Sequence, residues 1–471
     1  MKKPVRAITP HSAPIPHPPF RMPFIGDIFT VDFVKPAQAL ARQACELGGI
    51  FEQRVFGHPA IIISDTSLID ELNDEKVWEK HVGHVIRKLR PIGGDGLFTA
   101  YNDEPNWSKA HNILMPAFTR AAMLNYHDSI IHTVQELINT WNIGPAGRGW
   151  IDIPGEANRL TIEVISRAGF GYAFNKLSDE SVGPFIAAVL RELRYANRRT
   201  DVLPRYEQLF MRKRRRQHYE DKRYIRQQVD KIVEARKRQP RSNERRDMLD
   251  IMLQSTDPDT GENLDDANVA NQILTLLVAG SETSANTIAF ALHYLSANPD
   301  ICARARQEID ERWPNRSLPD IQFDEVAKLR YLRRIVDETL RLWPVAPGYF
   351  RQAKRDTALG GGKYRFKAKD WVFVLLLAAH RDPAWGPDAE KFNPDRFLAE
   401  NLRKLPPRTY KPFGTGPRSC IGRQFALHEV LVTLAMILHQ YHLEPDTGYQ
   451  LQVSETITLK PEQLRLRVHP R

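Results

Sequence analysis

The chain has 471 residues, of which 42% are hydrophobic and 26% are charged, and its formal net charge is +10. This composition indicates a globular protein long enough for a large core, and the positive charge favours acidic partners, although no nucleic-acid motif accompanies it. The three cysteines, Cys45, Cys302 and Cys420, lie far apart without zinc or CxxC spacing, so neither a disulfide framework nor a zinc site is indicated.

The N-terminal segment predicts a flexible arm over residues 1–21, followed by a single domain over residues 22–471. The first 19 residues are basic and rich in proline and histidine, and they lack an apolar run. We therefore expect neither a signal peptide nor a membrane anchor in this segment.

Local patterns predict a helix over residues 36–49 and two strands between residues 51 and 64. A further helix opens at Trp107, and long helical patterns follow to about residue 240. Segment 205–238 is dense in arginine and lysine. Charges all round with few apolar positions predict a solvated helix there, although an acidic carrier protein is a conceivable partner for it.

One long helix is predicted from Asp265 to Asn298, with acidic residues in its first turn and Pro299 just beyond its end. Its middle, Ile273 to Gly280, is apolar enough to suggest a membrane span. Glu282 and the short length of the apolar run argue against a span.

The pattern becomes β-like from Val345 to Leu377, and again from Tyr449 to Val468 near the end of the chain. Between them lie a proline-rich stretch, a glycine-rich loop and another helix. No internal repeat is present. Long helices in the middle of the chain with strands from both ends predict an α+β fold that is mainly helical.

The most informative stretch runs from Lys411 to Arg423, where a loop rich in glycine and proline delivers Cys420 to the start of a helix. A cysteine at a helix N-terminus faces free backbone N–H groups and the positive end of the helix dipole, and both favour a thiolate. Gly416 and Gly422 allow the backbone to approach something flat and large, and Arg418 adds a cation. A lone cysteine is usually a buried structural residue, but here the spacing Phe-x-x-Gly-x-Arg-x-Cys-x-Gly is complete.

This stretch resembles the haem-ligand loop of the cytochrome P450 family. The resemblance implies that Cys420 is the thiolate ligand of the iron of haem b, with Phe413 in the same loop. A thiolate ligand pushes electron density onto the iron and favours O–O cleavage.

Glu338 and Arg341 share a helix face at spacing i, i+3, which by itself is typical of a surface ion pair. Trp343-Pro344 follows them, and Arg396 stands in a later Phe-Asn-Pro-Asp-Arg-Phe segment. This order is similar to the family's Glu-x-x-Arg motif. The resemblance implies that Glu338, Arg341 and Arg396 form a structural triad that holds the cysteine loop.

Glu282 and Thr283 stand in the middle of the long helix. An isolated threonine there would bond back to the carbonyl of Ala279 and bend the helix. In this order before the cysteine loop, the two residues resemble the family's acid–alcohol pair. Dioxygen chemistry needs two protons in a dry pocket, so a hydroxyl that orients a proton and a carboxylate that relays it from solvent suit a catalytic role.

Trp107 and His111 are spaced i, i+4 and share a helix face, as an aromatic core pair would. Within the family pattern they look like donors to the haem propionates. Arg418 and Arg351 are expected to join them as cations.

Over nearly the whole chain, the match is closest to the haem domain of bacterial self-sufficient fatty-acid hydroxylases. Markers are the stretches 94–99, 109–114, 340–344, 422–429 and 458–461. The resemblance implies a substrate pocket over the haem, although ordinary core packing is the alternative for Phe98 and Ile457. The expected pocket residues are Phe98, Ala279, Ala346 and Ile457.

The chain departs from these relatives at three positions of the site. Ser281 stands where the relatives have a histidine before the glutamate of the long helix. His58 and Ile62 stand where they hold the fatty-acid carboxylate, at the channel mouth, with an arginine and a tyrosine. The fatty-acid assignment is weakened by these last two changes.

We therefore expect a haem-thiolate monooxygenase that inserts one oxygen atom from dioxygen into an apolar substrate. A long-chain fatty acid or acyl compound is the favoured substrate. The alternatives are hydroxylation or epoxidation of a secondary metabolite, and a haem-thiolate binding or rearranging protein that uses no external electrons. No flavin domain follows residue 471, so separate electron donors are expected, a ferredoxin or flavodoxin with its reductase, unless the chain is a fragment. We expect a bacterial, cytoplasmic monomer without a membrane anchor or a nucleic-acid partner.

Overall fold

The computed structural model describes residues 13–142, 149–174, 177, 183–198, 212–239, 246–406 and 408–471. The chain divides into two compact units, each made of three separate stretches. Unit 1 comprises Met1–His81, Arg334–Cys420 and Val453–Lys460, and unit 2 comprises Val82–Arg333, Ile421–Gln452 and Pro461–Arg471. The first 12 residues of the predicted arm lie outside the described residues, and the single domain over 22–471 stays a prediction.

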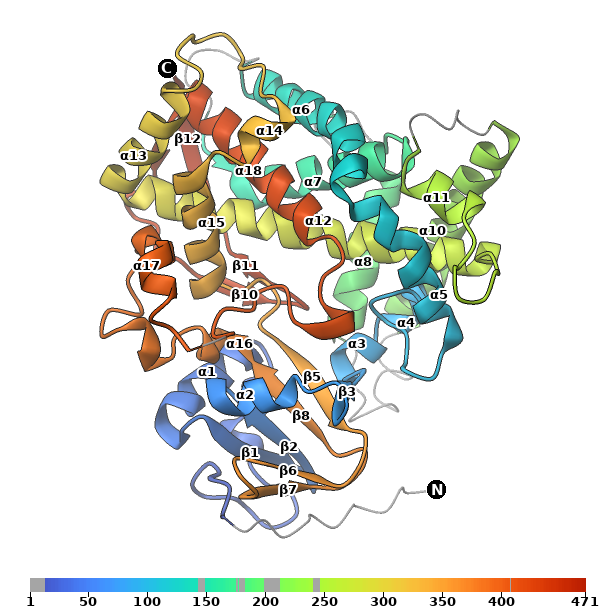
Figure 1. Cartoon of the computed structure of the whole chain (residues 1–471), viewed down its shortest axis with the longest axis vertical. Coiled ribbons are helices and arrows are strands. Elements are labelled where there is room, and N and C mark those ends of the chain that lie inside the picture. Colours follow the sequence, from blue (N-terminus) through green and yellow to red (C-terminus); the bar gives the residue numbers. More distant parts are fainter. Residues whose placement is uncertain are drawn as a thin grey trace. The chain divides into compact units, whose positions relative to one another are not determined.

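Unit 1 is built on a five-stranded sheet in the order β1-β2-β8-β5-β3, in which N-terminal strands pair with strands from much later in the chain (Figure 1). A two-residue turn joins β1 to β2, and its residues Phe56 and Gly57 have φ of 49° and 79°. This is the turn that suits the twist of a hairpin. Strand β2 runs parallel to β8, and the other pairs are antiparallel. The strands are β1 (Ile50–Val55), β2 (His58–Ile63), β3 (Trp78–Lys80), β5 (Gly348–Ala353) and β8 (Trp371–Leu375).

The β-branched run of β2 packs into the core of unit 1, where Ile61 and Ile63 meet Trp78, Val372 and Val374. Unit 1 also contains short helices and small strand pairs. The helices are α1 (Pro36–Leu47), α2 (Thr66–Leu72), α16 (Leu376–Ala379) and α17 (Ala399–Leu402). The pairs are β6 (Thr357–Leu359) with β7 (Tyr364–Phe366), and β10 (Val453–Glu455) with β11 (Leu459–Pro461). Helix α15 (Arg330–Leu342) begins in unit 2 and continues into unit 1.

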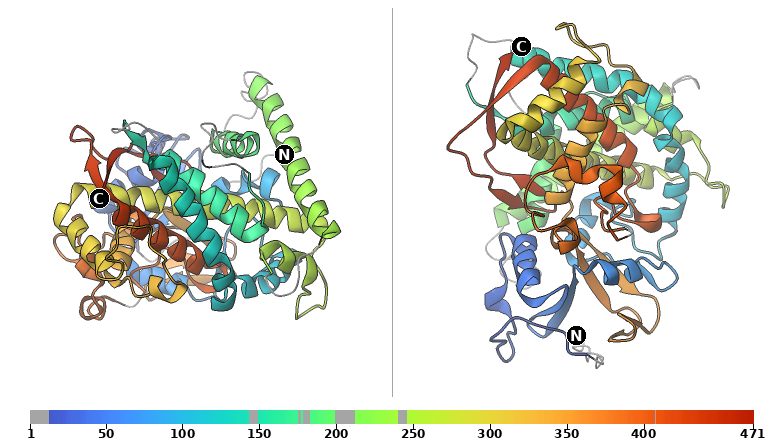
Figure 2. Two further views of the ribbon diagram at one scale, coloured as in Figure 1. Left: turned by 90° about the horizontal axis from the view of Figure 1, so that it is seen from above. Right: turned by 60° about the vertical axis from the view of Figure 1, so that its left-hand side comes forward.

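Unit 2 is mainly helical, with α12 packed against α7, α10 and α18 (Figure 2). Its longer helices are α5 (Pro105–Leu114), α6 (Arg120–Asn142), α7 (Ile153–Phe170), α8 (Pro184–Arg198), α10 (Arg212–Arg238), α12 (Asp266–Ala297), α13 (Pro299–Asp310) and α18 (Arg423–Gln440). The shorter ones are α3 (His84–Arg87), α4 (Arg90–Gly93), α11 (Met248–Gln254) and α14 (Phe323–Val326). Its three-stranded sheet has the order β4-β12-β9, from β4 (Ile151–Asp152), β9 (Tyr441–Pro445) and β12 (Arg465–Pro470).

The long helix that the sequence predicts is α12, and it begins as a helix with an acidic cap should. The side chain of Asp265 accepts a hydrogen bond from the backbone N–H of Asn268 at 2.7 Å. Among the described helices, α12 is long and apolar enough to span a bilayer, but 72% of its most apolar window is buried inside the protein. Burial of this kind is typical of a core helix.

Two details differ from the sequence predictions. Helix α10 is not solvated all round, because it buries Ile225, Val229, Ile232 and Val233. Strand β9 continues directly from α18 and was not predicted, because its residues follow a helical pattern without a turn signal. The predicted α+β fold with mainly helical content is confirmed.

Candidate active site

The Cys420 loop in unit 1 is held by its own backbone. The N–H of Cys420 donates to the carbonyl of Phe413 at 2.8 Å, and the N–H of Gly414 donates to the carbonyl of Lys411 at 3.1 Å. Gly414 and Gly416 have φ of 70° and 68°, which side chains rarely allow. The result is a short, fixed loop that presents an exposed cysteine.

The first residue of this loop is tied to a buried histidine. The backbone N–H of Lys411 donates to Nε2 of His380 at 3.1 Å. Complete burial lowers the pKa of His380 to about 3, so the ring is neutral and its Nε2 lone pair is free to accept. His380, the first residue of the stretch His-Arg-Asp-Pro, was not singled out from the sequence.

The structure brings Glu338, Arg341 and Arg396 together, and all three are buried. Glu338 receives two hydrogen bonds from Arg341, at 2.6 and 2.8 Å, and its carboxylate lies 3.4 Å from Nε of Arg396. Arg341 also donates to the carbonyl of His380 at 3.1 Å. The triad therefore reaches the Cys420 loop through His380, as a structural support would.

Arg351 is predicted to face a haem propionate, and the structure places it in a second support of the loop. It is 3% exposed and donates to the carbonyls of Leu72 and Trp78, both at 3.0 Å. Its third bond goes to Glu75 at 3.0 Å. A Cβ on Gly416 would lie 2.3 Å from the carboxylate of Glu75, so the loop packs directly on this pair. A role of Arg351 toward a propionate stays a prediction.

A third attachment joins the loop to the end of α2. The hydroxyl of Thr415 donates to Oδ1 of Asn73 at 2.5 Å, and the hydroxyl of Tyr349 donates to the same oxygen at 3.3 Å. Burial raises the pKa of Tyr349 to about 12, so the phenol stays a donor. Asn73 in turn donates to the carbonyl of Ile69 at 2.6 Å. Neither Asn73 nor Glu75 was singled out from the sequence, because their role depends on long-range packing.

In unit 2, a short segment in the middle of α12 is exposed to solvent, although most of this helix is buried. Ala279 is exposed and Val278, Gly280, Glu282 and Thr283 are partly exposed, whereas the turns on either side are mainly buried. Residues of the predicted acid–alcohol pair therefore lie where small molecules and protons can reach them.

The hydroxyl of Thr283 donates to the carbonyl of Ala279 at 2.8 Å. This is the bond that an ordinary mid-helix threonine makes. It occupies the hydroxyl proton and leaves the oxygen lone pairs as acceptors. Ser281 is buried and donates to the carbonyl of Leu277 at 2.6 Å, and its own carbonyl accepts from Thr161 of α7 at 2.9 Å. Ser281 thus points into the α7–α12 contact.

Trp107 and His111 lie on α5, with ring centroids 5.0 Å apart and the ring planes at 25°. Both are partly exposed, so this stacked pair is more open than a core pair. Their hydrogen bonding to a propionate stays a prediction. The role of Arg418 as a cation beside a propionate also stays a prediction, and Arg418 is partly exposed as well.

The predicted pocket residues fall in both units. In unit 2, Phe98 is 36% exposed and stands on a loop attached to α12, where the N–H of Leu97 donates to Gln272 at 3.0 Å. In unit 1, a hydrogen bond of 2.9 Å from Leu459 to the carbonyl of Val345 brings the segment of Ile457 beside that of Ala346.

The two predicted channel-mouth residues in β2 have different surroundings. His58 is exposed at the start of the strand. Ile62 is 1% exposed, and its strand pairs with β1 on one side and with β8 on the other. The placement of Ile62 at a channel mouth stays a prediction.

One buried acid was missed from the sequence, although it stands in a quoted marker stretch. Glu429 on α18 is fully buried, and this burial raises the pKa of its carboxyl to about 8, with the Ser284 hydroxyl of α12 opposing the rise. Ser284 directly follows Thr283. An acidic residue within an apolar helix face is the sequence signal that could have found it.

The residues fit a haem with a single protein ligand. The Cys420 thiol is exposed on a loop that contains two glycines with positive φ, Gly414 and Gly416. Among the residues that the structure describes, no group of three or more His, Cys, Asp or Glu could hold a metal ion by itself. A porphyrin that supplies four of the ligands and takes one thiolate from the protein matches this donor set.

Comparison with known proteins agrees with this geometry. Residues 16–468 match the family model described as cytochrome P450. The chain is 39% identical over 459 residues to a bifunctional cytochrome P450/NADPH–P450 reductase of Bacillus cereus, covering 97% of this chain and 42% of that protein. It is 34% identical over 461 residues to a self-sufficient cytochrome P450 monooxygenase of Phanerodontia chrysosporium, covering 97% and 43%.

A solved structure titled as a cytochrome P450, CYP102L1, is 56% identical to this chain with a TM-score of 0.93, covering 98% of this chain and 100% of that one. Fold and site together define a haem-thiolate protein of the P450 monooxygenase class. The chain belongs to the cytochrome P450 family. It spans about two fifths of the length of the curated relatives that it matches.

Proposed function

We propose that the chain is a monooxygenase that holds haem b through Cys420 and inserts one oxygen atom of dioxygen into an apolar substrate. The single observation that carries this proposal is the exposed Cys420 on a loop fixed by His380, the Glu338–Arg341–Arg396 triad and Asn73. When bound, the haem would supply the activation of dioxygen.

The protein residues have separate tasks in this proposal. Cys420 supplies the thiolate, and the loop supports fix where its sulfur lies. Trp107, His111, Arg351 and Arg418 are proposed to hold the propionates, with Phe413 beside the porphyrin. Glu282 passes protons from solvent to the Thr283 hydroxyl. Because this hydroxyl donates its proton to the Ala279 carbonyl, it must rotate away from that carbonyl before it can transfer a proton.

We propose that the substrate is a long-chain acyl compound. Its pocket would be lined by Phe98, Ala279, Ala346 and Ile457. The position of the carboxylate-binding arginine of the fatty-acid hydroxylases is held by His58, which lacks the permanent charge and the planar fork of an arginine, and buried Ile62 donates nothing. A carboxylate needs a permanent cation or several donors to offset its desolvation. Methyl esters should therefore bind about as well as free acids. Spectral titration of a long-chain acid and its ester, in wild type and His58→Arg, tests this point, and a much tighter acid in wild type would contradict it.

We further propose that a flavin-containing NADPH–P450 reductase supplies the electrons. Support comes from the Bacillus relatives, which are bifunctional cytochrome P450/NADPH–P450 reductases. A ferredoxin or flavodoxin with its own reductase is the second candidate donor. Product formation with each donor in turn separates the two, and the P450 reductase should support the faster turnover.

A tailoring role on a secondary metabolite is the second candidate function, and the replaced carboxylate anchor at His58 and Ile62 favours it. A rearranging protein without external electrons is less well supported, because Glu282 and Thr283 would have no protons to relay. A panel of lipids and polyketides, scored by the shift of the haem Soret band and then by NADPH consumption, decides among these functions. Lipid shifts without NADPH-dependent product would contradict the monooxygenase proposal.

A further inference from the structure

Unit 1 carries an unusual group of exposed aromatic side chains, which we call the phenylalanine surface. It consists of five phenylalanines, Phe20, Phe24, Phe29, Phe33 and Phe56, which are 93%, 95%, 80%, 72% and 43% exposed. Met22 and Val34 lie in the same segments and are 45% and 73% exposed. A cluster of this kind on a soluble protein marks an interaction surface.

The two segments of this surface are tied together by backbone hydrogen bonds. The N–H of Phe56, in the β1–β2 turn, donates to the carbonyl of Ile25 at 3.2 Å. The N–H of Asp27 donates to the carbonyl of Arg54 at 2.6 Å, and the side chain of Asp27 is fixed by Arg21 at 2.8 Å. The phenylalanines therefore stand on a braced loop and not on a loose tail.

The backbone of this loop adopts a conformation that exposes the rings. Phe20, Phe24 and Phe56 have φ of 62°, 65° and 49°, a region that non-glycine residues seldom occupy. Strain of this kind persists where the surrounding structure imposes it and is concentrated at functional positions.

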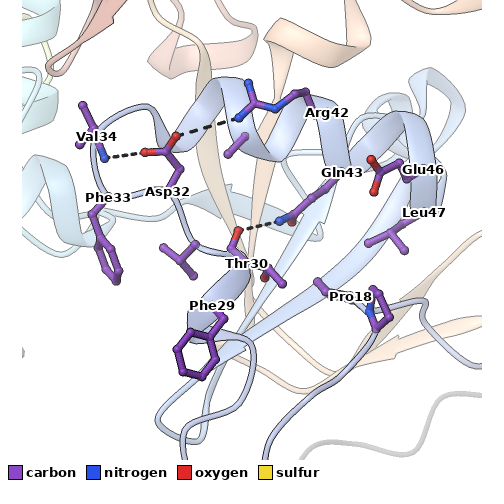
Figure 3. A pocket seen from close by; sticks show the side chains of 13 residues that line it. Pro18, Phe29, Thr30, Asp32, Phe33, Val34, Arg42, Gln43, Glu46 and Leu47 are labelled. Carbon is purple, nitrogen blue, oxygen red and sulfur yellow. Dashed lines mark hydrogen bonds and ion pairs between the residues drawn. The ribbon is translucent and has the colours of Figure 1, made fainter.

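An open groove of about 700 Å³ lies beside the projecting rings (Figure 3). Phe29 and Phe33 point to the same side of it, and Leu47 of α1 and Pro18 form another part of its lining. Phe20 follows directly on Pro19, which also lines the groove. Groove and projecting rings are thus parts of one surface.

We propose that the phenylalanine surface binds a second copy of this chain around a two-fold axis. Such an interface needs a surface that is complementary to itself, and this one combines projecting rings with a groove. A fully exposed aromatic side chain presents about 150–250 Å², so the five phenylalanines, scaled by their exposed fractions, offer roughly 600–950 Å². A standard interface buries about 800 Å² on each partner. A dimer would differ from the monomer expected from the sequence.

Three charged side chains also line the groove, Asp32, Arg42 and Glu46. The carboxylate of Asp32 accepts from the N–H groups of Val34 and Lys35, both at 2.8 Å. Arg42 lies 4.0 Å from the other oxygen of Asp32. The charge of Asp32 is therefore compensated within one copy.

The test measures the molar mass of the whole chain by sedimentation velocity over a range of micromolar concentrations. Wild type should form a concentration-dependent dimer. Phe20→Ser with Phe24→Ser removes projecting rings, and Val31→Lys puts a charge into the groove; each should raise the dimer dissociation constant at least about tenfold. Leu124→Ser and Met115→Ser are matched controls, since these residues are 45% and 48% exposed elsewhere, and they should leave it unchanged.

Mixing the two variants gives the sharper result. In a two-fold dimer each copy inserts its rings into the groove of the other, so a mixed pair regains one intact contact. The mixture should therefore contain more dimer than either variant alone. A chain without residues 1–12 should dimerise as wild type does, which separates a second copy from the N-terminal segment as the occupant.

Monomers at all concentrations would overturn the proposal. Monomers that bind phosphatidylcholine vesicles through the same phenylalanines would also overturn it, and would assign the surface to lipid. Circular dichroism of every variant shows that it folds.

Discussion

The backbone N–H of Lys411, which opens the Cys420 loop, donates to the Nε2 of His380 at 3.1 Å. His380 is buried, and its carbonyl accepts from Arg341 of the ion triad. One histidine therefore connects the buried charges to the loop that delivers the ligand.

Replacing His380 by Phe should loosen the loop. The Lys411 N–H would lose its acceptor, and an unsatisfied buried donor costs about 1–3 kcal/mol of unfolding free energy. We expect the haem content and the thiolate-type carbon-monoxide spectrum to fall together. His439→Phe is the matched control, since His439 is also buried and its Nε2–H donates to the Trp313 carbonyl at 2.9 Å. An equal loss of spectrum in both variants would argue against a special role for His380.

Replacing Glu338 by Gln should destabilise unit 1 strongly. The change leaves Arg341 and Arg396 buried without their carboxylate, and a broken buried pair costs about 3–5 kcal/mol. Urea unfolding measures this loss. Lys367→Met breaks an ion pair whose partners are 60% and 62% exposed, and it should cost less than about 1 kcal/mol. Similar midpoints for the two variants would contradict the buried triad.

Glu429 should make stability depend on pH. Its carboxyl has a pKa of about 8 in the fold, against 4.5 for an exposed glutamate. The folded state thus holds a proton that the unfolded state releases, so this group's contribution is full below about pH 4.5 and is lost as the pH rises toward about 8.

Glu429→Gln keeps the shape and removes the titration. The fall in unfolding free energy between about pH 5 and about pH 8 should shrink by of the order of 1–3 kcal/mol. Glu192, whose pKa burial also raises to about 8, should contribute separately, and the effect of Glu192→Gln should add to it. An unchanged pH profile in Glu429→Gln would show that the carboxyl is already ionised at neutral pH.

Replacing Thr283 by Ala should divert reducing equivalents to peroxide without loss of haem. Thr287→Ala is the control. The Thr287 hydroxyl donates to the Thr283 carbonyl at 2.9 Å, the same type of bond in the same helix, but Thr287 is buried. The ratio of product to NADPH consumed should fall several-fold for the first variant only. Equal ratios in the two variants would remove Thr283 from the proton relay.

The sequence was informative wherever function depends on neighbouring residues in the chain. The Cys420 loop, the Glu338–Arg341 spacing and the Glu282–Thr283 pair could all be recognised from local motifs. The bond between Lys411 and His380, and the contact of Gly416 with Glu75, join segments far apart in the chain. No local pattern contains such contacts.

Errors arose where burial depends on the rest of the fold. The burial of Ile62, which is 1% exposed, could not be predicted from its position in the sequence. Helix α10 was predicted to be solvated because its charges dominate, yet four apolar residues suffice to bury one face.

The most direct test of the account is the spectrum of the reduced, carbon-monoxide-bound protein with each cysteine replaced by Ser. Cys420→Ser should lose the red-shifted thiolate Soret band, whereas Cys45→Ser, an exposed site, and Cys302→Ser, a buried one, should keep it. If the Cys420→Ser variant still shows that band, Cys420 is not the iron ligand and the proposed function loses its basis.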